Sequence, residues 1–124
     1  RIEAQTMQEM VWQYILPAAS AYSKQLSDTA IVKAQLGIDN SFEKDQAAKI
    51  STLMSETVKN AQALADAAES ADEYSDNYTR ASVFRDKVLP AQEALRASVD
   101  GLEINTAKQS WPYPTYGDIL FSVQ

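Results

Sequence analysis

The sequence predicts an all-α protein, an antiparallel up-down-up bundle of three long helices followed by an extended aromatic C-terminal tail. Three observations predict this fold. Glycine occurs only three times in 124 residues, and alanine is abundant, which favours long helices with few interruptions. Apolar residues recur at steps of three and four positions, and no stretch sustains the alternation of a strand. The length fits one domain, with the bundle over 1–109 and the tail over 110–124.

The first helix is expected over residues 1–36. Its core face is marked by apolar and aromatic residues at helical spacing, namely Met7, Val11, Ile15, Ala18, Tyr22 and Leu26. Gly37 can adopt the left-handed conformation that ends a helix, and Ile38 can then fold back on Val32 in a Schellman-type stop. The connection to the next helix is therefore short.

The second helix is expected over residues 41–74. Asn40 is a suitable N-cap, and Glu43 stands three residues later, where it could complete a variant of the capping box. A heptad-like seam with many small residues follows, made of Ala47, Ile50, Met54, Thr57, Ala61, Leu64, Ala68 and Ala71. Small residues would allow a neighbouring helix to approach closely.

The third helix is expected over residues 77–108. Asp76 and Asn77 are candidate caps at its start. Its apolar face consists of Ala81, Phe84, Val88, Ala91, Leu95 and Leu102. Because both connections are short, consecutive helices should run antiparallel to each other.

Two of these helices contain an internal proline, Pro17 and Pro90, each within the string Leu-Pro-Ala. A proline inside a helix removes one backbone hydrogen bond and collides with the carbonyl four residues earlier, so we expect a kink at both. Counting from the helix starts places the two prolines at similar heights, within about one turn. The alternative is that each helix simply breaks at its proline.

The composition excludes several kinds of chemistry. The chain has no cysteine and no histidine, which excludes disulfides, Cys/His zinc sites, thiolate nucleophiles and imidazole acid-base catalysis. A net charge of −6 disfavours binding to nucleic acid or to an anionic membrane. No apolar run approaches the roughly 20 residues that span a bilayer. We expect a cytoplasmic setting.

One acidic cluster could be read as a metal site. It consists of Asp66, Glu69, Asp72, Glu73 and Asp76. Carboxylates bind Mg²⁺ and Ca²⁺, but this spacing lacks the glycine and alternating ligands of an EF-hand loop. We expect a solvated acidic face, with an acidic metal-binding bundle as the alternative.

The candidate interaction residues lie on the first helix and in the tail. Trp12 and Leu16 form a second apolar stripe with Ala19, so this helix needs cover on more than its core face. In the tail, Pro112 and Pro114 favour an extended backbone that holds out large side chains, and the candidates for contact are Trp111, Tyr113, Tyr116 and Phe121. The tail could dock on its own bundle or on a neighbouring domain.

The tail segment WPYPTYGDILF, residues 111–121, resembles the closing segment of type III glutamine synthetases. Two further stretches resemble that family in the same order. The first is Glu3-Ala4, with Met7 and Met10 following, which leads into Ile15-Leu16-Pro17-Ala18 and Tyr22. The second is Phe84-Arg85-Asp86-Lys87-Val88-Leu89-Pro90-Ala91, followed by Glu93 and Leu95-Arg96. The middle helix is similar only in its helical character.

The resemblance implies that the chain is a C-terminal helical domain of an enzyme that joins ammonia to glutamate with ATP and Mg or Mn. It implies no catalytic, cofactor-binding or metal-binding residue in this chain, because the family's active-site residues belong to domains upstream. The expected partners are that upstream catalytic domain and neighbouring subunits. The first residues, which begin without a methionine inside a helical pattern, also suggest a piece of a longer polypeptide. The alternative is a free-standing helical module that binds a partner protein through Trp12 and the tail.

Overall fold

The computed structural model describes residues 2–113, and within that range it contains helices and no strand. The prediction of an all-helical chain is confirmed for these residues. The helical elements are α1 (Ile2–Met10), the π-helical turn η1 (Val11–Ile15), α2 (Leu16–Gln35), α3 (Ser41–Asp72), α4 (Asn77–Val83), the π-helical turn η2 (Phe84–Val88), α5 (Leu89–Asn105) and the short 3₁₀ helix η3 (Lys108–Ser110). They form three continuous rods, 2–35, 41–72 and 77–105, which we call the first, second and third rod.

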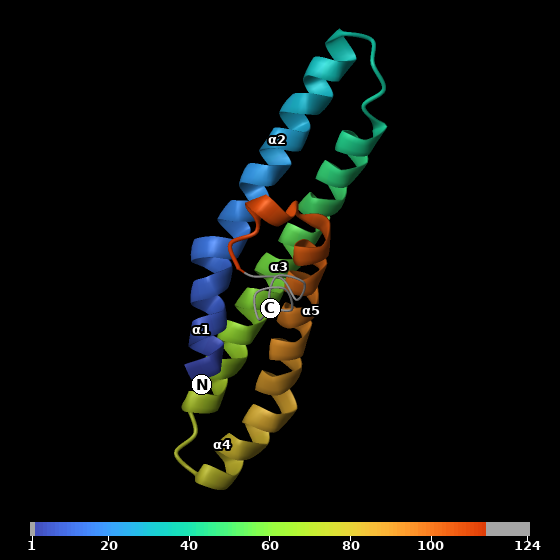
Figure 1. The fold of residues 1–124 in the computed structure, drawn as a ribbon. Coiled ribbons are helices and arrows are strands. Elements are labelled where there is room, and N and C mark those ends of the chain that lie inside the picture. The colour runs from blue at the N-terminus through green and yellow to red at the C-terminus, as the bar shows by residue number, and fades with distance from the viewer. Residues whose placement is uncertain (1, 114–124) are drawn as a thin grey trace, which may run out of the picture.

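The second rod, α3, lies between the other two (Figure 1). It runs in the opposite direction to both, and its main contacts are with α2 on one side and α5 on the other. The rods are staggered along their length. The α2–α3 end extends past α5, and the α3–α4 corner extends past the start of α1 (Figure 1).

The core follows the apolar seam of α3. Ile50 and Leu64 are fully buried, as are Leu95 and Leu102 on the third rod and Val11 on the first. The hydroxyl of the buried Thr57 donates to the Leu53 carbonyl oxygen at 2.8 Å, so this polar side chain is satisfied within its own helix. The burial of one α3 face by two partners makes this helix the centre of the domain.

Side-chain amides add polar links between the rods. Each donates to a main-chain carbonyl oxygen on a neighbouring rod: Gln8 to Ala61 at 2.6 Å, Asn40 to Ala30 at 2.9 Å, Gln46 to Asn105 at 2.9 Å and Asn60 to Ala94 at 3.1 Å. A carbonyl oxygen has two lone pairs and can accept such a bond beside its helical one. These directional contacts fix the lengthwise register, which apolar packing alone specifies less strictly.

The first rod ends as the sequence predicts. Gly37 has a φ of 72°, and the Ile38 amide donates to the Lys33 carbonyl at 2.8 Å while the Gly37 amide donates to that of Ala34 at 3.2 Å. These are the two bonds of a Schellman motif. The chain therefore reverses over a few residues and enters α3 beside the end of α2.

The predicted capping box at the start of α3 is wrong. Asn40 occupies the N-cap position, but its side chain binds the Ala30 carbonyl instead of capping. The Glu43 carboxylate pairs with the Lys33 ammonium at 2.7 Å. Asp39 instead accepts from the Ser41 amide at 3.2 Å and its hydroxyl at 2.6 Å. Contacts with α2 compete for the side chains that local rules assign to the cap.

The predicted cap of the third rod is confirmed. The Asp76 carboxylate accepts from the Thr79 amide at 2.7 Å and also from its hydroxyl at 2.7 Å. Both hydrogen bonds lower the pKa of Asp76, and the bond from the Thr79 hydroxyl has the larger effect. The third rod accordingly begins at Asn77, as predicted.

A π-helical turn directly precedes the Leu-Pro pair in each proline-bearing rod. The amide of Leu16 donates to the carbonyl of Val11, and that of Leu89 donates to that of Phe84, so both bonds span five residues. The wider turn accommodates the proline ring, which would collide with a carbonyl in a regular α-helix. Neither rod breaks at its proline, and the size of the bends at Pro17 and Pro90 stays a prediction.

The expectation that the two prolines lie at similar heights is wrong. Gln8 and Ala94 bind neighbouring residues of α3, Ala61 and Asn60, so they lie at nearly the same level. Pro17 lies above that level on the first rod and Pro90 lies below it on the third. Pro17 follows Gln8 by nine residues and Pro90 precedes Ala94 by four, in rods that run the same way. At 1.5 Å per residue, the two prolines are therefore at least roughly 15 Å apart along the rods. Counting from helix starts fails because the rods start at different heights.

The left-handed residue at the α2–α3 turn gives a stability prediction. Replacing Gly37 with alanine should lower the free energy of unfolding by about 1–2 kcal/mol, because φ is 72° and an L side chain is strained there. A Cβ at this position would meet nothing within 4 Å, so backbone strain is the sole expected cause. Gly37→Asn should cost less, because asparagine tolerates this conformation. Urea unfolding that shows equal losses for the two variants would contradict the strain argument.

The Lys33–Glu43 pair predicts a pH dependence. The hydrogen bond from Lys33 lowers the pKa of the Glu43 carboxyl below its ordinary value of 4.5. The pair therefore stabilises the fold above pH 4.5, and this stabilisation is lost as the pH falls through the pKa that Glu43 has in the folded state. Glu43→Gln should therefore lower the melting temperature at pH 7, and the deficit should shrink progressively below about pH 4.5. The exposed Glu93→Gln is the control. A deficit that is constant between pH 7 and pH 3 would refute the role of this pair.

Candidate interaction surfaces

The acidic cluster is dispersed in the structure. Its five carboxylates are exposed along the end of α3 and the following loop. Asp72 pairs with Arg80 at 3.6 Å, and Asp76 caps α4. Among residues 2–113, no group of three or more acidic side chains comes together in an arrangement that could hold a metal ion. Within the same range, no helix has the length and apolar character needed to cross a membrane.

The start of the tail folds back onto the domain. After α5, the short helix η3 turns the chain across the front of the molecule toward α2 (Figure 1). The amide of Trp111 donates to the Lys108 carbonyl at 3.1 Å, and Trp111 and Tyr113 then pack, partly buried, against the core. The other two predicted contact residues of the tail, Tyr116 and Phe121, lie outside the described residues.

Tyr113 meets an aromatic partner on the first rod. Its ring lies edge-on to that of Tyr14, with centroids 6.2 Å apart and planes at 71°. Such edge-to-face pairs are favourable beyond simple area burial. Burial raises the pKa of Tyr113, and the charges of Tyr14 and Glu9 raise it further. Sequence reasoning missed Tyr14 because its partner lies far away in the sequence and Tyr14 belongs to neither of the predicted apolar stripes.

The two candidate interaction residues on the first rod, Trp12 and Leu16, lie in different surroundings. Leu16 is buried in the core, whereas Trp12 remains 44% exposed. The Trp12 indole donates to the Gln8 side-chain oxygen at 3.0 Å, and the Gln8 amide in turn binds α3. Trp12 therefore remains partly open to solvent and orients an inter-rod link through Gln8.

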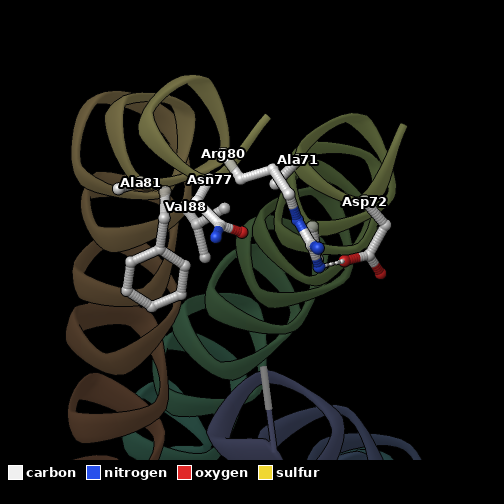
Figure 2. Close-up of a pocket in the computed structure, with 8 residues that line it drawn as sticks. Ala71, Asp72, Asn77, Arg80, Ala81 and Val88 are labelled. Carbon is white, nitrogen blue, oxygen red and sulfur yellow. Dashed lines mark ion pairs between the residues drawn. The ribbon is translucent and has the colours of Figure 1, made fainter. Parts of the chain in front are cut away.

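A cleft of about 580 Å³ opens at the α3–α4 corner (Figure 2). Its walls are mostly apolar, formed by Ala68, Ala71, Ala81, Phe84 and Val88. Polar side chains stand at its edge, where the ion pair of Arg80 with Asp72 lies next to Asn77 (Figure 2). The sequence pattern assigned these apolar residues of α3 and the third rod only to the core, so the cleft was not predicted.

An apolar patch lies at the opposite end of the molecule. We call it the tip patch, and its members are Ile31, Val32, Leu36, Ile38 and Phe42. All are more than half exposed. They surround the α2–α3 turn, which extends past α5, so the third rod leaves them uncovered (Figure 1). Clustered exposed apolar side chains of this kind are typical of protein contacts.

Comparison with known proteins gives one informative similarity. The chain is 30% identical, over 135 aligned residues, to a glutamine synthetase of Butyrivibrio fibrisolvens. The alignment covers 99% of this chain but only 18% of that relative. No protein-family model matches the chain. The similarity therefore fits a fragment of a glutamine synthetase.

The packing of the tail against the first rod gives a prediction for the pKa of Tyr113. In the intact chain its phenol should ionise above pH 10, the ordinary value, because burial and the charges of Tyr14 and Glu9 oppose ionisation. Docking of the ring should be complete below pH 10 and weaken as the pH rises through the folded pKa. Tyr14→Ala should lower the pKa of Tyr113 toward its ordinary value.

The measurement is an NMR titration of labelled tyrosine. A peptide of residues 108–124, which lacks the rods, is the control for an undocked Tyr113. Identical titration curves in the peptide and in the intact chain would show that the ring does not dock.

Proposed function

We propose that this chain is a non-catalytic structural and assembly domain of a type III glutamine synthetase. In this proposal the parent polypeptide is a cytoplasmic enzyme that ligates ammonia to glutamate with ATP and Mg or Mn. The domain contacts the catalytic part of its own polypeptide and neighbouring subunits. It contributes no residue to the reaction.

The observation that carries the proposal is the extent of the similarity to a glutamine synthetase. Identity of 30% extends over 99% of the chain, while the aligned part is only 18% of the relative. A match that runs through all three rods supports common descent of the whole helical unit. The small share of the relative supports a parent in which most of the polypeptide, and with it the chemistry, lies outside this chain.

The residues of the chain support a structural role. With no histidine and no cysteine, imidazole acid-base catalysis and thiolate nucleophiles are missing. Several of the described carboxylates serve caps or ion pairs, as with Asp76 and Glu43. The apolar surfaces, by contrast, are placed at both ends of the rods, where a larger assembly could cover them.

The free-standing interaction module is the second candidate, and the tip patch favours it equally well. An exposed apolar surface does not distinguish a separate partner from another part of the same polypeptide. The small covered share of the glutamine synthetase relative favours the assembly domain.

The test compares two proteins, residues 1–124 alone and the longer polypeptide of the natural gene. With glutamate, ammonia, ATP and Mg²⁺ or Mn²⁺, the longer polypeptide should form glutamine and residues 1–124 should not. Deleting residues 1–124 from the longer polypeptide should reduce its oligomer, measured by analytical ultracentrifugation. Glutamine formation by residues 1–124 alone, or a deletion that leaves the oligomer unchanged, would contradict the proposal.

A point variant separates assembly from folding. Phe42→Ser on the tip patch should weaken the oligomer of the longer polypeptide while leaving the melting temperature of residues 1–124 nearly unchanged, because Phe42 is 63% exposed in the chain alone. The matched control is Tyr78→Ser, an aromatic side chain that is 80% exposed at the other end of the molecule. Equal oligomer stability in Phe42→Ser and the unmodified protein would remove the tip patch from the assembly surface.

A further inference from the structure

The cleft at the α3–α4 corner differs from the tip patch in having charges of both signs at its edge. The tip patch consists of apolar side chains alone, which is typical of contact with another polypeptide. The cleft, of about 580 Å³, combines apolar walls with the side chains of Arg80, Asp72 and Asn77 (Figure 2). Small-molecule sites have volumes in this range and place a few polar groups beside an apolar space. The cleft therefore has the composition of a ligand site.

The apolar part of the cleft has room for one large side chain. On the α3 side it is lined by Ala68 and Ala71, and on the third rod by Ala81, Phe84 and Val88. Because an alanine side chain is a single methyl group, the space between the two rods stays open at this level. An aliphatic or aromatic group that entered it would leave water and be stabilised by apolar burial.

The ion pair at the edge can accept further partners. The Arg80 Nη2 atom and the Asp72 Oδ1 atom are 3.6 Å apart, whereas a direct charge-assisted hydrogen bond is about 2.7–2.9 Å long. Both side chains are partly exposed, and a pair of this kind contributes little to stability. Each of the two charges can therefore turn toward a ligand at small cost.

A ligand with a single charge fits this edge poorly. The five carboxylates of the acidic cluster, exposed along the end of α3 and the following loop, repel an anion. The Arg80 guanidinium repels a cation that approaches Asp72. A zwitterion avoids both penalties, because its ammonium group can pair with Asp72 while its carboxylate group pairs with Arg80.

We propose that the cleft binds a free α-amino acid with a large apolar side chain. Its ammonium and carboxylate groups are attached to one carbon atom, so opposite charges lie side by side, as they do in the Arg80–Asp72 pair. The head group lies along that pair with its charges reversed, and the side chain enters the space lined by Phe84 and Val88. The Asn77 amide, at the same edge, can donate to the carboxylate of the ligand or accept from its ammonium.

The test is an NMR titration of residues 1–124 with L-phenylalanine and with analogues that each lack one part of it. 3-Phenylpropionate lacks the ammonium group, phenethylamine lacks the carboxylate group, and L-alanine lacks the large apolar group. L-Phenylalanine should shift the amide resonances of residues 68–72 and 77–88 in a saturable manner, and each analogue should bind at least tenfold more weakly. The absence of saturable shifts with L-phenylalanine, or equal affinity for any analogue, would overturn the proposal.

Substitutions at the edge assign the two charges. Arg80→Gln should weaken the binding of L-phenylalanine at least tenfold but should not weaken that of phenethylamine. Asp72→Asn should weaken the binding of L-phenylalanine but not that of 3-phenylpropionate. Arg85→Gln is the matched control, because it removes the same charge from an exposed arginine of the same rod. Equal losses in Arg80→Gln and Arg85→Gln would reduce the effect to net charge and contradict a specific site.

Filling the cleft tests its apolar part. Ala81 lines the cleft and is exposed, so Ala81→Leu should keep the melting temperature of residues 1–124 and weaken the binding of L-phenylalanine at least tenfold. Ala97→Leu, at an exposed position of α5 outside the cleft, is the control and should bind like the unmodified chain. Unchanged binding by Ala81→Leu would show that the ligand lies elsewhere.

The longer polypeptide of the natural gene should bind L-phenylalanine at the same residues. Binding by residues 1–124 that is lost in the longer polypeptide would show that another part of it covers the cleft, and would overturn the proposal. Glutamine formation is a separate measurement, so the inference and the proposed function can fail independently.

Discussion

The burial of one face of α3 by two other rods is the constraint on which the structure depends. Side chains such as Ile50 and Leu64 are fully buried only because α2 and α5 approach from both sides. The approach of α5 is close, since a Cβ at Gly101 would lie 2.9 Å from the Leu53 Cδ2 atom. Helix α3 alone, an amphipathic rod with small residues in its seam, would have little intrinsic stability in water.

The register of this packing determines which surfaces remain open. The amide links from Gln8, Asn40, Gln46 and Asn60 each join a particular turn of one rod to a particular carbonyl of another, so the lengthwise stagger is fixed together with the core. With that stagger, the α2–α3 turn extends past the end of α5, and the α3–α4 corner extends past the first turn of α1 (Figure 1). The tip patch and the cleft at the α3–α4 corner are therefore two results of one offset.

Sequence reasoning succeeded where a feature depends on neighbours in the chain. The Schellman stop at Gly37 and the cap at Asp76 need only a few consecutive residues, and both are present. It failed where side chains had alternative partners across the fold, as with Asn40 and Glu43, which bind α2. The contact of Tyr14 was not predicted either, because it depends on Tyr113, which the fold brings from far along the chain.

The start of the aromatic tail covers a part of the core that the three rods alone leave open. Helices α2 and α5 both contact α3, and after α5 the start of the tail crosses the front of the molecule toward α2 (Figure 1). Trp111 and Tyr113 pack into the core at this place, and Pro112 between them limits the backbone freedom that docking must remove. The tail thereby covers part of the long side of the bundle, while Trp12 stays partly exposed there and the tip patch and the cleft remain open at the two ends.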